Sequence, residues 1–411
     1  MNEDGGRPTL GFRSVLRNRQ YVVFLASANS SAMGYSVYSI SIVWLTYTLT
    51  HDFLVVGAVL AIEAAAYTAT FLFGPIVDRV RNQRTIFLWS YPVQAAAAAV
   101  LGWGVVARFI TEPLLFGLVA AISLLWDMTW AAANAAPGVL LSPDEQFAAS
   151  GVSGALGGGL SILGYALGGA LILAVGADGG MFLYAGLLVA ATLLAVPLRI
   201  SPPTGPERSF AESFWEGWRF VTGGRGRPLL QLAAVDSIVG FLTFAPALLI
   251  TLLATTIYHG SPTGYGVLFV ADVAGGVLAG LALGRWNPRG RVGLVLGISL
   301  LVAAVSVVVA VALPAVLVLG AIAWFAVGFA SSSYLDAKYA FYRGAVPPER
   351  IARLVSNMYL FAGAASTVGA LVLGGLATSG NPWPLGLAAG AAYGLAGLGA
   401  LLLPGVRQMR Y

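Results

Sequence analysis

The sequence contains twelve stretches of mostly apolar residues, each long enough to cross a lipid bilayer as a helix. Short breaks rich in Pro, Gly, Asp or Arg separate these stretches. Backbone polar groups find no water inside a bilayer, so chain segments that cross it must be helical or form a closed barrel. We place the twelve helices at residues 21–49, 53–77, 86–107, 112–137, 147–175, 180–198, 228–257, 264–284, 292–312, 314–342, 350–378 and 384–404.

The composition argues against most other classes of protein. Of the 411 residues, 58% are hydrophobic and 9% are charged, whereas a soluble domain is about 45–50% apolar and about 25% charged. Cysteine is absent and the two histidines, His51 and His259, are far apart in the sequence, so we expect no metal site. The one lysine, Lys338, is not part of a G-K-[ST] loop, so we expect neither a P-loop nor another cofactor. These features exclude a soluble enzyme and a nucleic-acid binder.

The distribution of basic residues predicts which helix ends face the cytoplasm. If residue 1 lies inside, 21 of the 22 Lys and Arg residues fall in cytoplasmic segments, and only Arg108 falls outside. This is the positive-inside pattern of helical membrane proteins, and it accounts for the net charge of +5. We therefore expect a multi-pass protein of the plasma membrane, the inner membrane of a prokaryote, with both termini in the cytoplasm.

Two glycine patterns repeat at one spacing and predict two homologous halves. Gly74 has a counterpart at Gly280 and Gly168 has one at Gly374, and both pairs are 206 residues apart. Parallel six-helix halves are an established transporter architecture. Aromatic residues between the halves recur at helical spacing and predict a short amphipathic helix on the membrane surface. The resulting divisions are an N-terminal half at 1–198, a cytoplasmic linker at 199–227 and a C-terminal half at 228–411.

The residues after the second predicted helix resemble a motif of the major facilitator superfamily. The segment GPIVDRVRNQR begins at Gly74, contains Asp78 and Arg79, and ends at Arg84. The segments TLTHDFLVVG and VPPERIARLVS resemble, within that family, the subgroup that holds the enterobactin exporter and macrolide-efflux proteins. The resemblance covers nearly the whole chain. It implies an all-α integral membrane fold with twelve transmembrane helices in two pseudo-symmetric six-helix halves.

The resemblance also implies roles for particular segments. In the family this loop holds the halves together in the outward-open state, and the third, sixth, ninth and twelfth helices face lipid. The implied conformational latch consists of Gly74, Asp78, Arg79 and Arg84. The sequence departs from the family pattern in the second copy of the loop, which has Gly284 where the family pattern has Asp. It departs again at Leu160 and Tyr165, which replace a Gly and the Pro of the drug/proton antiporter motif.

Four carboxylates in the predicted spans are candidates for proton coupling. An ionisable side chain inside a bilayer costs roughly 2.5–3.5 kcal/mol, which marks it as a functional candidate. Desolvation disfavours the charged form, so such a group is able to exchange protons. The alternative is that each carboxylate is held by a neighbouring Ser, Tyr or Arg and never titrates. The candidates are Glu63 and Asp127, which we rank first, followed by Asp236 and Asp272.

Aromatic and polar side chains in the same spans predict a cavity for a bulky amphipathic compound. Aromatic rings stack on flat groups and attract cations, although ordinary packing is the alternative explanation for each ring. Asp336 and Lys338 are two residues apart and therefore point in different directions on a helix. Lys338 either pairs across the cavity or extends to the membrane surface. The candidate residues are Asn29, Tyr35, Tyr38, Trp126, Trp130, Tyr334, Asp336, Lys338 and Tyr359.

Together these features predict a secondary active transporter rather than an enzyme. The interpretation is a monomeric, proton-coupled antiporter that exports drug-like or siderophore-like amphipathic compounds by alternating access. Its partners are a small-molecule substrate, protons and the lipid bilayer, without nucleic acid. One alternative is a facilitator or importer of a small metabolite such as a sugar. Another is a transporter-like sensor or assembly subunit, for which a cavity too narrow or too apolar to hold a solute would be the sign.

Overall fold

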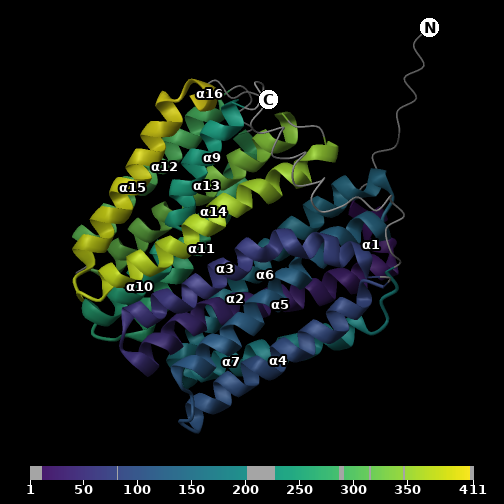
Figure 1. Ribbon diagram of the computed structural model, residues 1–411, viewed down its shortest axis with the longest axis horizontal. Coiled ribbons are helices and arrows are strands. Elements are labelled where there is room, and N and C mark those ends of the chain that lie inside the picture. Colours follow the sequence, from purple (N-terminus) through teal and green to yellow (C-terminus); the bar gives the residue numbers. More distant parts are fainter. Residues whose placement is uncertain are drawn as a thin grey trace.

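A computed structural model describes residues 12–80, 82–200, 227–286, 291–313, 316–345 and 348–407. These ranges are helical apart from short connections (Figure 1). The amphipathic helix predicted in the linker falls at residues 201–226, outside the described residues. In the N-terminal half the helices are α1 (Phe12–Arg17), α2 (Arg19–Thr50), α3 (Phe53–Arg79), α4 (Arg84–Val106), α5 (Glu112–Leu140), α6 (Pro143–Val175) and α7 (Ala177–Ala195). In the C-terminal half they are α9 (Arg227–Phe241), α10 (Ala245–Thr256), α11 (Pro262–Trp286), α12 (Val292–Ala312), α13 (Leu317–Ala345), α14 (Pro348–Ala377), α15 (Pro382–Leu402) and α16 (Pro404–Arg407).

Eleven helical segments of the described chain are long and apolar enough to cross a membrane. The remaining predicted span, the first of the series at 21–49, corresponds to α2, a helix of 32 residues whose Ser, Thr, Tyr and Asn side chains lower its hydropathy. At 1.5 Å per residue α2 is about 48 Å long, which exceeds the ~30 Å hydrocarbon core. Because α2 packs on α3, α5, α6, α7 and α10, other helices cover its polar side chains. The chain is therefore a multi-pass helical membrane protein whose helix ends lie within a few residues of the predicted ones.

The predicted span at 228–257 is confirmed as one apolar segment, Pro228–Thr256, but its helix is interrupted between α9 and α10. Pro246 explains the interruption. Its ring would clash with the carbonyl group four positions earlier, and it has no N–H to donate to that carbonyl. Before it the chain makes tight turns, in which the N–H of Thr243 donates to the carbonyl of Gly240 at 3.0 Å.

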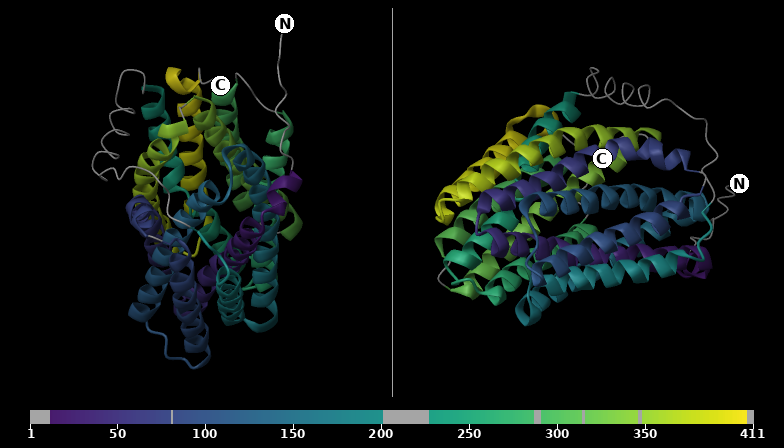
Figure 2. Two further views of the ribbon diagram at one scale, coloured as in Figure 1. Left: turned by 90° about the vertical axis from the view of Figure 1, so that its right-hand side faces the viewer. Right: turned by 60° about the horizontal axis from the view of Figure 1, so that its bottom comes forward.

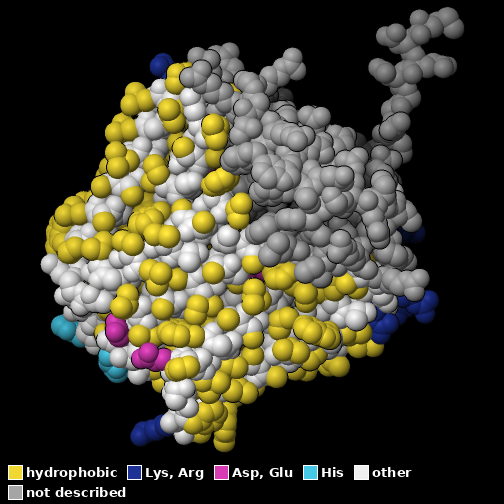
Figure 3. All heavy atoms as spheres, in the orientation of Figure 1, with side chains coloured by type: hydrophobic (Ala, Val, Ile, Leu, Met, Phe, Trp, Pro, Cys, Tyr) yellow, Lys and Arg dark blue, Asp and Glu magenta, His cyan; other side chains and the backbone are white. Residues whose placement is uncertain are grey.

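Four helices lie on the outer flanks of the molecule: α4 beside α7 in one half and α12 beside α15 in the other (Figures 1 and 2). All four are fully described, and their interiors contain no Asp, Glu, Lys, Arg or His. Figure 3 shows hydrophobic side chains over most of the described surface, with Lys and Arg at its margins. These four helices are the third, sixth, ninth and twelfth of the predicted series, which the family resemblance expects to face lipid. Their apolar interiors suit that position.

The two halves meet at two helix crossings, α3 with α14 and α6 with α11. The predicted repeat relates these crossings to each other, because α3 corresponds to α11 and α6 corresponds to α14. Each crossing has glycine on both helices. A Cβ placed on Gly374 would lie 2.8 Å from the Cα of Gly57, and one placed on Gly169 would lie 3.2 Å from the Cα of Gly266. The absence of side chains therefore permits close backbone approach between the halves.

Both glycine crossings lie near the same face of the molecule. Gly57 and Gly266 are each four residues after the first residue of their helix, α3 or α11. We call this face the histidine face, because His51 and His259 lie in its loops. The opposite face, where α2 and α9 begin, carries most of the arginines, and we call it the arginine-rich face. The sequence predicts that the histidine face is outside the cell.

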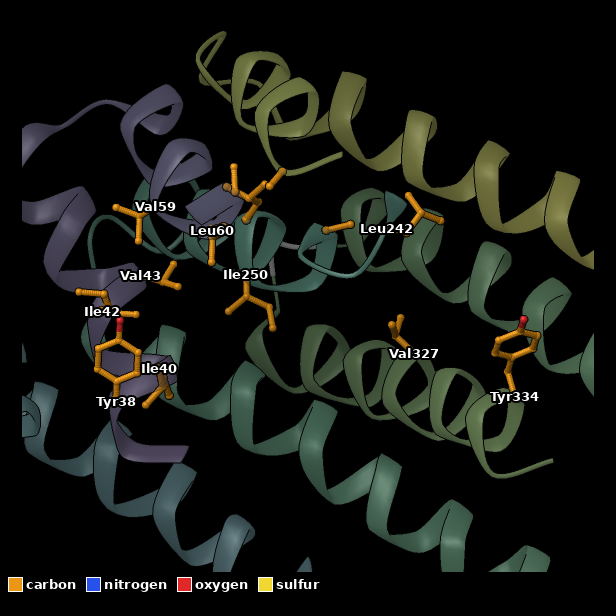
Figure 4. Packing of buried hydrophobic residues seen from close by; sticks show 14 of the residues in the cluster. Tyr38, Ile40, Ile42, Val43, Val59, Leu60, Leu242, Ile250, Val327 and Tyr334 are labelled. Atoms are coloured by element: carbon orange, nitrogen blue, oxygen red, sulfur yellow. The ribbon is translucent and has the colours of Figure 1, made fainter. Parts of the chain in front are cut away.

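Side chains extend the contact between the halves at the histidine face. The hydroxyl group of Tyr265 donates to the carbonyl oxygen of Ile40 at 2.8 Å, which joins α11 to α2. Figure 4 shows Val43, Leu60 and Ile250, from α2, α3 and α10, directed toward one another. All three are buried. The halves are therefore held together at the histidine face by backbone contact, by a hydrogen bond and by apolar packing.

We predict that Gly57→Val opens the histidine face. A Cβ at this position would lie 2.6 Å from the carbonyl oxygen of Ala370, and such overpacking costs about 1–3 kcal/mol, which shifts a two-state equilibrium about fivefold or more. The measurement is labelling of Ser39→Cys, a reporter in a chain without native cysteine, by an impermeant maleimide outside intact cells. The matched control is Gly186→Val, because a Cβ at Gly186 meets nothing within 4 Å. Equal labelling of both variants would contradict the prediction.

Candidate functional site

A cavity of about 580 Å³ lies between the two halves, and we call it the central cavity. Helices α2, α3, α5 and α6 of the N-terminal half line it, together with α9, α10, α11, α13 and α14 of the C-terminal half. Its volume lies in the range of small-molecule sites, about 300–1,000 Å³. The interruption between α9 and α10 also lines it, through residues such as Thr243 and Phe244. Irregular backbone is tolerated inside a membrane where it faces such a cavity.

The lining of the central cavity has an excess of acidic groups. It contains all four carboxylates that the sequence nominates for proton coupling: Glu63, Asp127, Asp236 and Asp272. The exposed fractions of Glu63, Asp127 and Asp236 are 8%, 6% and 4%. Lys338 is the one Lys or Arg among the described lining residues. Acidic side chains therefore outnumber basic ones among the described lining residues.

Glu63 and Asp272 occupy corresponding places in the two halves. Each lies ten residues after the first residue of its helix, Phe53 in α3 or Pro262 in α11. Each also lies six residues beyond a crossing glycine, which is about 9 Å along a helix. The spacing between these corresponding helices is 209 residues, slightly different from the 206 of the glycine motifs. One carboxylate of each half therefore lies just below the contact that closes the histidine face.

Glu63 is surrounded by tyrosine rings. The ring of Tyr38 lies 5.5 Å from that of Tyr35 and 5.2 Å from that of Tyr184, measured between centroids. The Oε1 atom of Glu63 and the hydroxyl of Tyr38 are both buried, and the two side chains interact with each other although neither atom forms a hydrogen bond of good geometry with a described residue. A charged carboxylate is costly in such a place, whereas a protonated one is neutral. The role of Glu63 in proton coupling stays a prediction.

Asp236 and Lys338 form a buried ion pair between α9 and α13. The Nζ atom of Lys338 lies 2.7 Å from Oδ1 of Asp236, and the hydroxyl of Tyr334 donates to the same oxygen at 3.1 Å. Nζ also lies 5.6 Å and 5.3 Å from the ring centroids of Tyr334 and Tyr339, where the ring faces attract a cation. Of the two alternatives for Lys338, the structure therefore shows pairing rather than extension to the membrane surface.

Tyr35 and Trp126 form a flat aromatic wall on the N-terminal side of the central cavity. Their ring centroids are 3.9 Å apart and the rings are inclined by 4°. Trp130, one helical turn along α5, lines the cavity beside them. A wall of this kind stacks on planar solutes and, where a ring face is free, attracts cations.

Other predicted cavity residues lie outside this lining. Tyr38 and Tyr334 are buried behind it, and Asn29 lines a second cavity within the N-terminal half. Asp336 approaches α11, since a Cβ placed on Gly280 would lie 3.4 Å from its Oδ2 atom. The side chain of Tyr359 falls outside the described residues.

Of the four residues of the predicted latch, Arg84 is the one whose side chain the structure describes. Arg84 is the first residue of α4, and its Nε atom is buried without a hydrogen-bond partner among the described residues. The side chains of Asp78 and Arg79, in the last turns of α3, fall outside the described residues, as do the surroundings of Gly74. The role of this segment as a conformational latch stays a prediction.

The sequence analysis missed several cavity residues, among them Tyr67 and Tyr165. Spacing would have found Tyr67, because it is four residues after Glu63 and so shares a helix face with a nominated residue. Tyr165 packs on Phe269 of the other half, with ring centroids 5.8 Å apart.

Comparison with solved structures identifies the architecture. No protein-family model and no curated protein matches the sequence. A bacterial homolog of the human lysosomal transporter Spinster, in an inward-facing, unoccupied conformation, is 15% identical with a TM-score of 0.75, over 96% of this chain and 98% of that one. The nucleoside transporter NupG is 13% identical with a TM-score of 0.73, over 93% and 98% of the two chains. The chain has the major facilitator fold.

The comparison confirms the predicted fold class, an all-α membrane protein with two pseudo-symmetric halves. A third similar structure is a bacterial homologue of the iron transporter ferroportin in its inward-facing state, with a TM-score of 0.64, 13% identity, and coverage of 93% of this chain and 98% of that one. Two of these three structures are described as inward-facing. In the present chain the halves are joined at the histidine face.

We predict that Lys338→Met destabilises the protein by about 3–5 kcal/mol, because it leaves the Asp236 carboxylate buried without its counter-ion. Replacing both partners, as in Asp236→Asn with Lys338→Met, restores most of the loss, because the desolvated charge is gone and Asn still accepts from Tyr334. The measurement is the unfolding midpoint of each purified variant in detergent. If the double variant is as unstable as Lys338→Met, the ion pair is not the cause.

Proposed function

We propose that this chain is a secondary active transporter that exports amphipathic organic cations in exchange for protons. The observation that carries the proposal is the central cavity, which holds four carboxylates and one ammonium group between the two halves. The fold supports transport, since the similar structures carry names of transporters for nucleosides or iron. The acidic excess and the Tyr35–Trp126 wall support a cation with an aromatic part.

The geometry suggests how export proceeds. In the present arrangement the halves are joined at the histidine face, and a cationic solute reaches the carboxylates from the arginine-rich face. Rocking of the halves then separates the glycine crossings and exposes the cavity to the other side. On that side, protons bind Glu63 or Asp127 and neutralise the negative charge of the carboxylate, so the cation dissociates. The halves then return to the first arrangement with a neutral cavity. Asp272 provides a second group beneath the crossings, whereas Asp236 already has Lys338 as a counter-ion.

Finer parts of the proposal rest on the sequence. The resemblance to the enterobactin-exporter and macrolide-efflux subgroup supports efflux, with drug resistance as the physiological outcome. The positive-inside pattern supports a plasma-membrane location with both termini in the cytoplasm. We also propose that the protein works as a monomer, because the central cavity is built from the two halves of one chain.

A facilitator or importer of a small metabolite is the second candidate. The ion pair between Asp236 and Lys338 favours it, because a permanently paired carboxylate does not carry protons. Glu63 is buried beside the Tyr38 hydroxyl rather than beside a cation, which favours proton coupling instead. A sensor would be favoured by a cavity too narrow or too apolar to hold a solute. The central cavity has a volume of about 580 Å³ and acidic walls, so it does not favour this alternative.

We predict that everted membrane vesicles containing the protein accumulate tetraphenylphosphonium when a proton gradient is imposed. Glu63→Gln and Asp127→Asn each abolish the gradient-driven part of this uptake, because each removes a group that binds protons in the cavity. The measurement is uptake of the labelled cation with and without a protonophore.

The matched control is Asp178→Asn, which removes a carboxylate from the first turn of α7, outside the central cavity. This variant keeps gradient-driven uptake. Uptake that is equal with and without the protonophore would favour the facilitator. No proton-dependent uptake of any cation in a broad panel would overturn the export proposal.

A further inference from the structure

A second cavity of about 540 Å³ lies within the N-terminal half. Its described lining comes from α2, α4, α5 and α6 and includes no residue of the C-terminal half. It is displaced toward the arginine-rich face, since it uses residues 24–32 near the start of α2 and residues 126–138 near the end of α5. Its size alone would accommodate a drug-sized fragment. We call it the ring pocket.

The chemistry of the ring pocket differs from that of the central cavity. None of its described lining residues is an Asp, Glu, Lys, Arg or His. Its rings come from Phe24, Tyr91, Trp126 and Trp130, and its hydrogen-bonding side chains include Asn29, Ser31 and Asn134. The lining therefore suits an uncharged, flat group that both stacks and forms hydrogen bonds.

Two polar side chains of the ring pocket have unused bonding capacity. Ser31 is 2% exposed, and its hydroxyl lies beside that of Tyr91, which also lines the pocket, without forming a hydrogen bond of good geometry with a described residue. Asn134 is exposed to the cavity, and it donates from Nδ2 to the carbonyl of Trp130 at 2.8 Å, which orients the amide and leaves Oδ1 accessible. A poorly bonded hydroxyl and an accessible amide oxygen in one cavity wall are able to bond to a ligand.

The ring pocket adjoins the central cavity through two tryptophans. Trp126 and Trp130 line both cavities, and their separation of four residues places them on one face of α5. Tyr35 covers Trp126 from the central side. A single elongated molecule is therefore able to place one end among the carboxylates and the other in the ring pocket, on either side of this wall.

We propose that the ring pocket is a second substrate subsite, which binds the flat, uncharged, hydrogen-bonding ring of a substrate whose cationic end occupies the central cavity. This inference rests on the proposed function for the cationic end of the substrate. The ring pocket itself binds a neutral ring whether or not the protein exports cations. The substrate class is thus narrowed from amphipathic cations in general to cations that carry a polar planar ring.

The test uses three probes on the purified full-length protein by isothermal titration calorimetry. Ethidium is a cation with two ring amines, 3,8-diamino-6-phenylphenanthridine is its uncharged ring system, and tetraphenylphosphonium is a cation without hydrogen-bonding groups. The variant Ser31→Ala with Asn134→Leu removes both unused bonding groups. We expect it to weaken binding of ethidium and of the neutral ring roughly tenfold. Binding of tetraphenylphosphonium stays unchanged, which also shows that the variant is folded.

The matched control is Ser237→Ala, which removes a hydroxyl that bonds the carbonyl of Ala233 within α9 and lines neither cavity. It leaves all three affinities unchanged. Two results overturn the proposal: failure of the neutral ring to bind the wild-type protein, or equal loss of all three probes in the double variant, which would assign Ser31 and Asn134 a purely structural role.

The outcomes also separate this inference from the proposed function. If vesicles accumulate tetraphenylphosphonium by a proton gradient but the neutral ring does not bind, export stands and the ring pocket fails. If the neutral ring binds in a manner that depends on Ser31 and Asn134 while no cation is transported, the ring pocket stands and export fails.

Discussion

Close backbone contact between glycines determines where the two halves meet, and the central cavity depends on it. At Gly57 with Gly374 and at Gly169 with Gly266, no side chain separates the helices. Because both crossings lie near the histidine face, the halves are joined there and the cavity lies beyond the contact. Glu63 and Asp272 follow one crossing glycine each at the same spacing. Any motion that parts the helices therefore changes the surroundings of one carboxylate in each half together.

The site combines approximate symmetry with a clear asymmetry of charge. Glu63 and Asp272 are related by the repeat, but the buried ammonium group and its acidic partner both belong to the C-terminal half. The ring pocket and the Tyr35–Trp126 wall belong to the N-terminal half. One half thus supplies stacking and neutral hydrogen bonds, while the other supplies an internal counter-ion. On the proposed function, this division matches a substrate with dissimilar ends.

The sequence predicts much of this structure, because a bilayer imposes strong rules on length and polarity. Helix positions and the fold class follow from apolar stretches and from the motif at Gly74. The nomination of Glu63, Asp127, Asp236 and Asp272 follows from the cost of burying charge, and the structure places all four in one cavity. The ion-pair partner of Lys338 could not be predicted from the sequence, because Asp236 lies 102 positions away. The break before Pro246 was overlooked because hydropathy continues unchanged across it.

The single lysine of the chain gives the central cavity a chemical handle. Lys338 is 4% exposed and lines that cavity, and the chain contains no cysteine to compete for electrophiles. Apart from the amino terminus, an acylating reagent has one primary amine to attack, and it must enter the cavity to do so. Acylation would neutralise that ammonium group and leave the Asp236 carboxylate without its cation. An amine-reactive molecule small enough to enter would therefore act as a site-directed inactivator, and a bound solute would protect against it.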